Sequence, residues 1–317
     1  MFGKSLAAAI AFWGLSVAAS AAAGDLRAIE PAEWNRAKAA HLLERAGFGG
    51  TPAEIDAFAA LTPREAVRRL VYFEGAASTA DLPAFDESGV FDEGLEAFPP
   101  SRPATTDLAK ARGEALGVKV KPDGNRRMQP VVNKFFYWLR ASRLETHRVA
   151  YWWANRMLAS PRPLEEKMAL FWHGHFATSE EKVRDYRKML QQLQLFQREG
   201  LGDFRTLLVA VAQEPAMLAF LDAGVNVKGA PNENFAREIM ELFSMGVGNY
   251  TEHDIREAAR AFTGWDFEGL RFVVYDDKHD DGSKTVLGAT GRFDGVDVID
   301  VILRQPVTAE FIAGKLY

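Results

Sequence analysis

The sequence contains no cysteine among its 317 residues. This absence excludes disulfide frameworks, thiolate zinc sites, iron–sulfur clusters and cysteine nucleophiles. An excess of positive charge is also absent: the formal net charge is −5, whereas a nucleic-acid-binding surface is normally basic. No Gly-x-Ser-x-Gly, P-loop or Gly-x-Gly-x-x-Gly string occurs, so nothing nominates a catalytic serine or a phosphate-binding loop. The remaining composition, 48% hydrophobic and 26% charged, is that of a globular protein.

Long hydrophobic runs are missing everywhere except at the start of the chain. Lys4 precedes an Ala-rich apolar run over residues 6–19, and small residues at Ala19, Ala21 and Ala23 form two overlapping cleavage patterns. A membrane anchor would need about 20 strongly apolar residues, which this run does not supply. We therefore expect a signal peptide over residues 1–23 and an exported protein, periplasmic or extracellular, without an integral membrane segment once the signal is removed.

Most of the remaining chain carries helix signals. Thr51-Pro52-Ala53-Glu54 and Thr62-Pro63-Arg64-Glu65 each place Thr at the N-cap, Pro at the first helical position and Glu where it closes a capping box. A third capping box, Thr178-Ser179-Glu180-Glu181, predicts one helix that runs to Gly200. A further helix is expected over residues 232–245, between Pro231 and Gly246.

Strand signals are confined to one region. Residues Leu270–Tyr275 and Lys284–Leu287 are typical of strands and are separated by an Asp-rich turn that closes on Gly282. The predicted fold is therefore mainly α, a single multi-helical domain over residues 24–317 with one small β-hairpin.

Residues 75–127 differ from their surroundings. This stretch is rich in proline, and its first part is acidic, so it cannot bury enough apolar surface to fold by itself. We interpret it as a long surface excursion, either a lid or a linker, and favour the linker. At the other end, the apolar helix that starts at Thr308 has no stop signal, from which we expect that the C-terminal part of the domain is missing.

Two histidines stand close together in Trp172-His173-Gly174-His175-Phe176. Without cysteine, a transition-metal site must use histidines and carboxylates. Residues two apart diverge by about 200° on a helix, so His173 and His175 can chelate only if Gly174 ends the helix. The competing interpretation, which the frequency of chance His-x-His matches favours, is one core histidine and one solvated histidine.

A second group of polar residues lies in the helix expected over 232–245. Asn234, Glu238 and Glu241 line one edge of its apolar stripe, and Arg237 can pair with Glu233 or Glu241. Glu238 and Glu241 could act as a general base and a metal ligand. The alternative, an ion-pair ladder on a solvated face, is about equally supported.

A third polar cluster covers residues 276–284. It departs from an EF-hand loop because His279 takes a ligand position and Gly288 stands where the bidentate Glu belongs. His279 and Asp280 remain metal-ligand candidates. The simpler interpretation is a solvated turn.

Several ordered strings together resemble a large bacterial family catalogued as domain of unknown function eighteen-hundred. The resemblance extends from about residue 36 to the end of the chain. It implies an exported bacterial protein, but the family brings neither an established activity nor assigned catalytic residues. The strings are His41–Gly49, Phe171–Phe176, Asn232–Leu242, Gly264-Trp265 and His279–Gly288.

The leading functional hypothesis is an exported hydrolase assisted by a zinc-like divalent metal that activates water. In this hypothesis Glu238 is the base, the histidine pair holds the metal, and the Asp-rich turn helps to close the site. Its substrate and the identity of its metal are unknown. The residues assigned are Glu238, Glu241, Asn234 and Arg237 for catalysis and His173, His175, His279 and Asp280 for the metal.

The alternative hypothesis is a non-catalytic envelope protein that binds a protein partner or a glycan. Its contact surface would be formed by exposed Trp138, Trp152, Trp153 and Trp172. A chaperone for a secreted partner is a third possibility, but it leaves no signature in the sequence. Burial of the tryptophans would disfavour the binding protein, and about one bound metal per chain would favour the enzyme.

The signal-peptide hypothesis predicts that the mature chain begins near Ala22 or Gly24, after one of the two small-residue patterns. N-terminal sequencing of the protein from the cell-envelope fraction measures this directly. A cytoplasmic product that retains Met1 would contradict the prediction.

Overall fold

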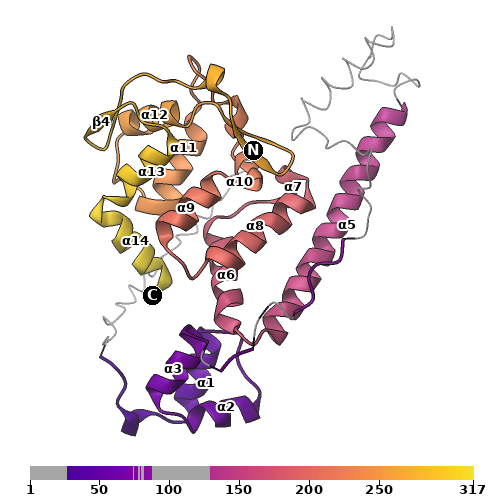
Figure 1. The fold of residues 1–317 in the computed structure, drawn as a ribbon, viewed down its shortest axis with the longest axis vertical. Helices are drawn as coiled ribbons and strands as arrows, with labels where there is room; N and C mark the ends of the chain where they lie inside the picture. The colour runs from indigo at the N-terminus through magenta and orange to yellow at the C-terminus, as the bar shows by residue number, and fades with distance from the viewer. Residues whose placement is uncertain (1–26, 74, 78, 80–81, 88–128) are drawn as a thin grey trace, which may run out of the picture.

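The structure is a computed structural model, and the fold is mainly α-helical, which confirms the predicted fold class (Figure 1). No helix within the described ranges is both long and apolar enough to span a bilayer. The residues described are 27–73, 75–77, 79, 82–87 and 129–317, with residues 129–138 described as backbone only.

Three short helices form a small unit at one end of the molecule (Figure 1). They are α1 (Arg36–Arg45), α2 (Pro52–Ala59) and α3 (Pro63–Val71). Thr51 caps α2 and Thr62 caps α3, each within a complete capping box. Both predicted helix starts are confirmed, because a capping box depends only on residues within one turn of each other.

Two longer helices connect this unit to the rest of the fold. The long helix α5 (Gln129–Ala159) runs along one side, and α6 (Pro163–His175) turns back from its end (Figure 1). Proline has no amide hydrogen and its ring clashes inside a helix, so Pro161 and Pro163 set the corner between α5 and α6. His175 is the last residue of α6, and Gly174 lies inside the helix rather than ending it.

The helix predicted to run from Ser179 to Gly200 is interrupted, so that prediction is wrong in its middle. The structure has a short α7 (Glu180–Val183) and a separate α8 (Tyr186–Glu199). Arg184 between them adopts a left-handed conformation with φ of 56°. The Asp185 carboxylate then accepts a hydrogen bond from the Arg187 amide and begins α8. An Asp can cap a helix locally, but the strained residue before it has no signal in the sequence.

The remaining helices surround one continuous apolar core, which also takes in side chains of α6 and α8. Its largest fully buried side chains include Phe176, Phe196, Phe235 and Phe262. These helices are α9 (Phe204–Ala212), α10 (Pro215–Phe220), α11 (Glu233–Met240), α12 (Glu252–Ala261), α13 (Gly295–Leu303) and α14 (Pro306–Leu316). Short 3-10 turns lie at Pro31–Glu33, Ala223–Val225 and Asp276–Lys278, and a π-helical turn continues α11 over Glu241–Met245.

Instead of the single hairpin expected over residues 270–287, the structure has two separate ones. The predicted pairing was wrong because each strand pairs with a near neighbour across a tight turn. Leu287 and Gly288 both have positive φ, which is the backbone of a two-residue hairpin turn. The pairs are β1 (Trp265–Glu268) with β2 (Arg271–Val274), and β3 (Lys284–Val286) with β4 (Ala289–Gly291).

Part of the excursion predicted over residues 75–127 is described, and it lies against α5. The Trp152 indole donates to the Pro83 carbonyl at 2.8 Å, and the Phe85 ring packs against Trp152 and Tyr186. Residues 88–128 and the expected signal peptide lie outside the described residues.

A buried carboxylate joins three of the helices. Glu166 of α6 is 1% exposed and accepts from the Trp153 indole at 2.9 Å and from Arg156 Nε at 3.0 Å, both on α5. It also accepts from Gln197 Nε2 of α8 at 2.8 Å. A buried charge is tolerated only when it is paired and hydrogen-bonded. The three donors satisfy this requirement for the Glu166 carboxylate.

We predict that Glu166→Ala lowers the free energy of unfolding by about 3–5 kcal/mol, because it leaves one buried donor and two partly buried donors, one of them a guanidinium, without their acceptor. Urea unfolding followed by circular dichroism measures this. Asp56→Ala is the matched control, because it breaks an exposed ion pair with Arg36 and should cost less than about 1 kcal/mol. Equal stability of the two variants would contradict the role of Glu166.

Candidate functional site

His173 and His175 point towards different neighbours. The His173 ring lies 5.5 Å from the Trp153 ring and 6.4 Å from the Phe196 ring. His175 Nε2 lies 3.1 Å from the Phe243 carbonyl oxygen. Because a carbonyl only accepts, that nitrogen carries the hydrogen. Burial lowers the pKa of both histidines, so both are neutral at pH 7. Since α6 is continuous through both, their rings diverge as helical geometry requires.

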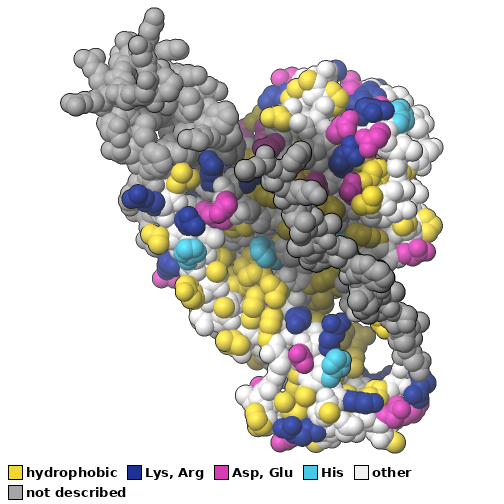
Figure 2. Space-filling view, turned by 180° about the vertical axis from the view of Figure 1, so that it is seen from behind, with side chains coloured by type: hydrophobic (Ala, Val, Ile, Leu, Met, Phe, Trp, Pro, Cys, Tyr) yellow, Lys and Arg dark blue, Asp and Glu magenta, His cyan; other side chains and the backbone are white. Residues whose placement is uncertain are grey.

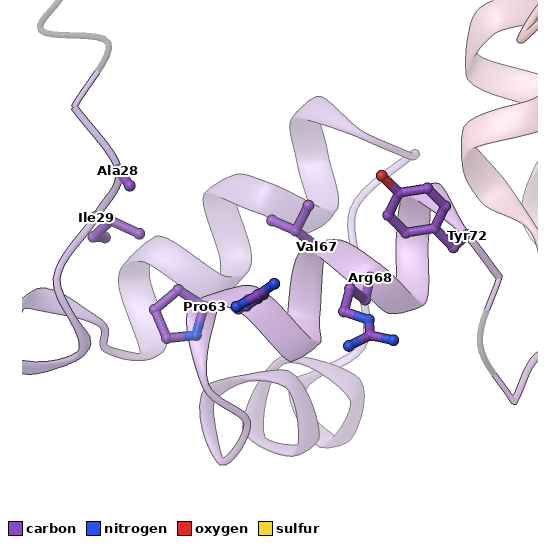
Figure 3. A pocket seen from close by; sticks show the side chains of 7 residues that line it. Ala28, Ile29, Pro63, Val67, Arg68 and Tyr72 are labelled. Carbon is purple, nitrogen blue, oxygen red and sulfur yellow. The ribbon is translucent and has the colours of Figure 1, made fainter.

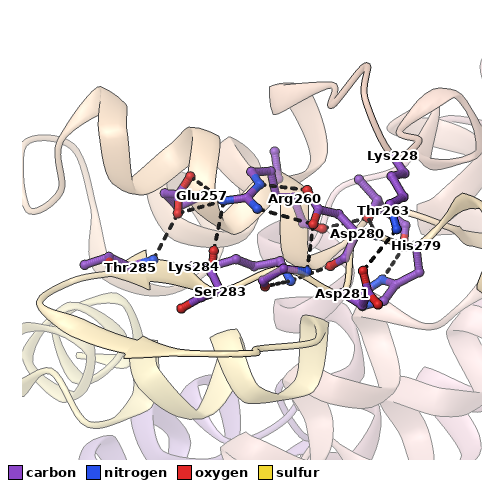
Figure 4. A network of polar contacts seen from close by, with 12 residues as sticks. Lys228, Glu257, Arg260, Thr263, His279, Asp280, Asp281, Ser283, Lys284 and Thr285 are labelled. Atoms are coloured by element: carbon purple, nitrogen blue, oxygen red, sulfur yellow. Dashed lines mark hydrogen bonds and ion pairs between the residues drawn. The ribbon is translucent and has the colours of Figure 1, made fainter.

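His279 and Asp280 are held by a separate polar network (Figure 4). His279 Nδ1 donates to the Thr263 carbonyl at 2.9 Å. Asp280 accepts from Arg260 Nε at 2.8 Å and from the Gly282 amide at 2.9 Å. The hydrogen bond from Arg260 is the main cause that lowers the pKa of Asp280 to about 2. The acceptor atoms of Asp280 are therefore already occupied.

Arg260 also binds α12 to the following hairpin. Its Nη1 donates to Glu257 at 3.0 Å, and Glu257 in turn accepts from the Thr285 amide at 3.0 Å. Lys284 is 1% exposed and donates to the Gly282 carbonyl at 3.0 Å. Figure 4 shows these groups pointing towards one another between helix and hairpin. We call Arg260, Glu257 and Asp280 the hairpin clamp.

The structure does not bring the four predicted metal ligands together in one cluster of described residues. No group of three or more His, Asp or Glu side chains able to hold a metal ion is present within the described part of the chain. His173 and His175 diverge on one helix, while His279 and Asp280 serve the Thr263 carbonyl and Arg260. This corrects the expectation that these residues converge.

The polar edge of α11 is divided between paired and unpaired groups. Arg237 donates to Glu233 at 3.0 Å and to Glu252 of α12 at 2.7 Å. The sequence offered Glu233 or Glu241 as the partner of Arg237, and the structure has Glu233. The second partner of Arg237 is Glu252, which lies on another helix. Hydrogen bonds to Glu252 raise the pKa of Arg237 further above its usual range. Asn234 Nδ2 donates to the Leu221 carbonyl at 3.1 Å. Arg237 and Asn234 thus fix α11 to its neighbours.

Glu241 stands where the α-helix changes into the π-helical turn, and the Tyr250 hydroxyl donates to its carboxylate. Burial first, and the bond to Glu241 second, raise the pKa of Tyr250 to about 12. Ser244 inside the turn donates to the Ile239 carbonyl at 2.6 Å. Single π-helical turns inside helices are frequent at functional sites. Neither Tyr250 nor the π-helical turn was predicted from the sequence.

Glu238 is the exception in this neighbourhood. It is partly buried, yet its carboxylate makes no hydrogen bond or ion pair with any residue that the structure describes. Burial, and then the nearby charge of Glu241, raise the pKa of Glu238 above its ordinary value. Two neighbouring carboxylates in different environments are a recurrent arrangement for acid–base chemistry.

A buried polar cluster on α8 and α10 was missed by the sequence reasoning. Glu214 caps α10 through the Ala216 amide at 2.8 Å, and Gln192 Nε2 donates to the same oxygen at 3.2 Å. Burial raises the pKa of Glu214 to about 8. Lys188 lies 3.5 Å from Asp185 and 4.4 Å from the centre of the Phe267 ring. Charged residues usually lie on the protein surface, so the sequence gives no indication that these are buried.

Two cavities are found at the α1–α3 unit, away from the residues predicted to carry chemistry. The first, of about 900 Å³, is lined by residues of α3 and of the preceding segment (Figure 3). Figure 3 shows Val67 and Arg68 of α3, and Tyr72 just after it, on one side of this cavity and Ala28 and Ile29 on the other. The second, of about 670 Å³, lies between this unit and the α5–α6 corner. Neither is lined by any of the predicted site residues.

The tryptophan surface required by the binding-protein hypothesis is not present on the described side chains. Trp153 and Trp172 are 9% and 4% exposed. Trp152 is half-buried beneath Phe85 and Arg156. The side chain of Trp138 lies outside the described residues.

Comparison with known proteins identifies one family. Its model, described as "Protein of unknown function (DUF1800)", matches residues 41–317, which is most of the chain. No curated protein and no solved structure matches.

The hairpin clamp yields a prediction for stability. Arg260→Met leaves Asp280 and Glu257 without their shared cation, and we expect it to lower the free energy of unfolding by about 2–4 kcal/mol at pH 7. Both carboxylates have lowered pKa values in the folded protein. Their stabilisation is therefore present above pH 5 and is lost as the pH falls towards 2.

Urea unfolding measured between pH 7 and pH 2 tests this dependence. The wild-type protein should lose more stability over that window than Arg260→Met. Arg271→Met breaks an exposed pair with Glu268 and should follow the wild type. An equally steep loss in Arg260→Met and wild type would show that the clamp contributes nothing.

Proposed function

The chain belongs to the DUF1800 family, and from its own side chains we propose that it is an exported hydrolase in which Glu238 is the general base. Glu241, which accepts a hydrogen bond from Tyr250, is the neighbouring carboxylate. Arg237 and Asn234 position α11, since their contacts are to Glu252 of α12 and to the Leu221 carbonyl.

The observation that carries the proposal is the missing partner of Glu238. Its neighbours are satisfied: Glu233 and Glu252 share Arg237, and Glu241 accepts from Tyr250. A partly buried carboxylate without a partner costs stability. Such a cost is common where a group is kept available for chemistry.

The raised pKa of Glu238 suits it to the role. A general base works best when its pKa lies near the operating pH. In the proposed step, one O–H bond of a water molecule breaks and its proton moves to the Glu238 carboxylate. The water oxygen forms a bond to the electrophilic carbon of the substrate, and the leaving group departs with the electrons of the broken bond.

The metal assistance expected from the sequence is not part of this proposal. A zinc-like ion beside Glu238 and Glu241 would need at least one further ligand, and no described His, Asp or Glu supplies it. The competing binding-protein hypothesis gains no support, because Trp153 and Trp172 are buried. Export remains an expectation from the N-terminal sequence.

The test is Glu238→Gln, which keeps the shape of the side chain and removes the base. With a panel of p-nitrophenyl esters and glycosides, we expect kcat/KM to fall by about 10²–10⁴-fold. The wild-type rate should increase with pH through the raised pKa of Glu238. Glu310→Gln, an exposed substitution on α14, should retain full activity. Equal turnover by Glu238→Gln, or no turnover by the wild type, would contradict the proposal.

Stability provides a readout that needs no substrate. A carboxylate with a raised folded-state pKa destabilises the fold once the pH rises above its unfolded value. Glu238→Gln should therefore be at least as stable as the wild type at pH 7, and the difference should vanish near pH 4. A structural role for Glu238 would instead make the variant less stable at pH 7.

A further inference from the structure

The second cavity lies where three parts of the chain meet. Its walls come from the α1–α2 turn, from α3, and from the corner between α5 and α6. Its volume of about 670 Å³ falls within the range of small-molecule sites in proteins. None of the residues of the proposed hydrolase site lines it, so any binding here is independent of the Glu238 proposal.

The cavity has apolar walls on both sides. Leu43, Phe58 and Leu70 come from the α1–α3 unit, and Met157 and Leu158 come from the end of α5. Leu158 is 81% exposed, so most of its side chain faces water at the edge of the cavity. An apolar ligand in the cavity would remove this surface from water.

Rigid backbone forms the rest of the wall. Gly49 has φ of +88°, and a Cβ on Gly50 would come within 2.9 Å of Leu43 Cδ1. On the opposite side, Pro161 and Pro163 fix the corner. On the side of Gly49 and Gly50, the wall of the cavity is therefore backbone, and no side chain extends from it into the space. Gly49 is the last residue of the string His41–Gly49, and Gly50 follows it directly.

One charged group in the cavity lacks a partner. Among the described lining residues, Arg69 is the only one with a cationic side chain, and it forms no hydrogen bond or ion pair with the described chain. Its weak attraction to Glu65 is shared with the capping of α3 at Thr62. The only lining carboxylate, Glu54, is already used by the Thr51 amide at 2.7 Å.

Two further cations lie next to residues that line the cavity. Arg162 Nε donates to the Ala77 carbonyl at 3.2 Å, and its Nη1 is paired with Glu165 at 3.3 Å. Lys167 donates to the Glu44 carbonyl at 3.3 Å and lies 5.2 Å from the centre of the Phe48 ring. Figure 2 shows basic, acidic and hydrophobic side chains next to one another in the lower part of the molecule.

We propose that this cavity binds an amphiphile that carries a carboxylate on an apolar chain. The chain lies against Leu43, Leu70 and Leu158, and the carboxylate pairs with Arg69. A guanidinium binds a carboxylate through two parallel hydrogen bonds, so the charge and the apolar walls select the two ends of one ligand.

The experiment measures binding to the full-length protein by isothermal titration calorimetry at pH 7.4. The probes are decanoate, decanol and acetate, each kept below the concentration at which it self-associates. Decanoate should bind in a saturable manner, decanol about 10–100-fold more weakly, and acetate should not bind measurably. The first ratio is the value of a charge-assisted hydrogen bond.

Two variants separate charge from wall. Arg69→Gln should weaken decanoate binding by about 10–100-fold and leave decanol binding unchanged. Leu158→Ser should weaken the binding of both decanoate and decanol. Because Leu158 is highly exposed, this substitution should not unfold the protein. Arg64→Gln is the matched control, because Arg64 lies on the same helix but lines the other cavity.

Three results would overturn the proposal. They are equal affinity for decanoate and decanol, an equal effect of Arg69→Gln and Arg64→Gln, and the absence of saturable decanoate binding. A loss of hydrolytic activity in Glu238→Gln with unchanged decanoate binding would leave both proposals intact. Decanoate binding without any hydrolysis would remove only the hydrolase.

Discussion

The burial of one carboxylate, Glu166, is the constraint on which the arrangement of the helices depends. A charge that is 1% exposed must be compensated, and its partners come from α5 and α8. These hydrogen bonds fix the rotation of α6 about its axis. Once that rotation is fixed, His173 faces Trp153, and His175 meets the π-helical turn at the Phe243 carbonyl.

Hydrogen-bond partners also distinguish polar groups that hold the fold together from polar groups that are left to bind a ligand or a substrate. Arg237 and Arg260 each bind two carboxylates, and a fully paired guanidinium rigidifies the elements it joins. Asp280 has its oxygens occupied, which is why an Asp-rich turn that looks like a metal loop acts as a clamp. Glu238 and Arg69 remain without partners among the described residues. They lie on different elements, which separates the proposed chemistry from the proposed binding cavity.

The candidate site was predictable from the sequence only in part. The spacing of Asn234, Glu238 and Glu241 placed them on one edge of α11, because helical periodicity fixes the face of every residue. It could not show that Tyr250 would occupy Glu241 or that Glu252 would join Arg237. It also could not place Arg69 beside Leu158, because these residues are 89 positions apart and meet only at the α5–α6 corner.

The sequence by itself determined the helical class and most helix starts. Thr51 and Thr62 needed only the glutamate three residues later to cap α2 and α3, and such local bonds form whatever the rest of the chain does. Only the tertiary structure decided which polar groups were used up and which strands paired. The short strands around Leu287 found their partners through backbone turns, and His279 and Asp280 found theirs on α12 and in the residues that follow it. The partners of His279 and Asp280 depend on contacts between residues far apart in the sequence, whose energies no local pattern records.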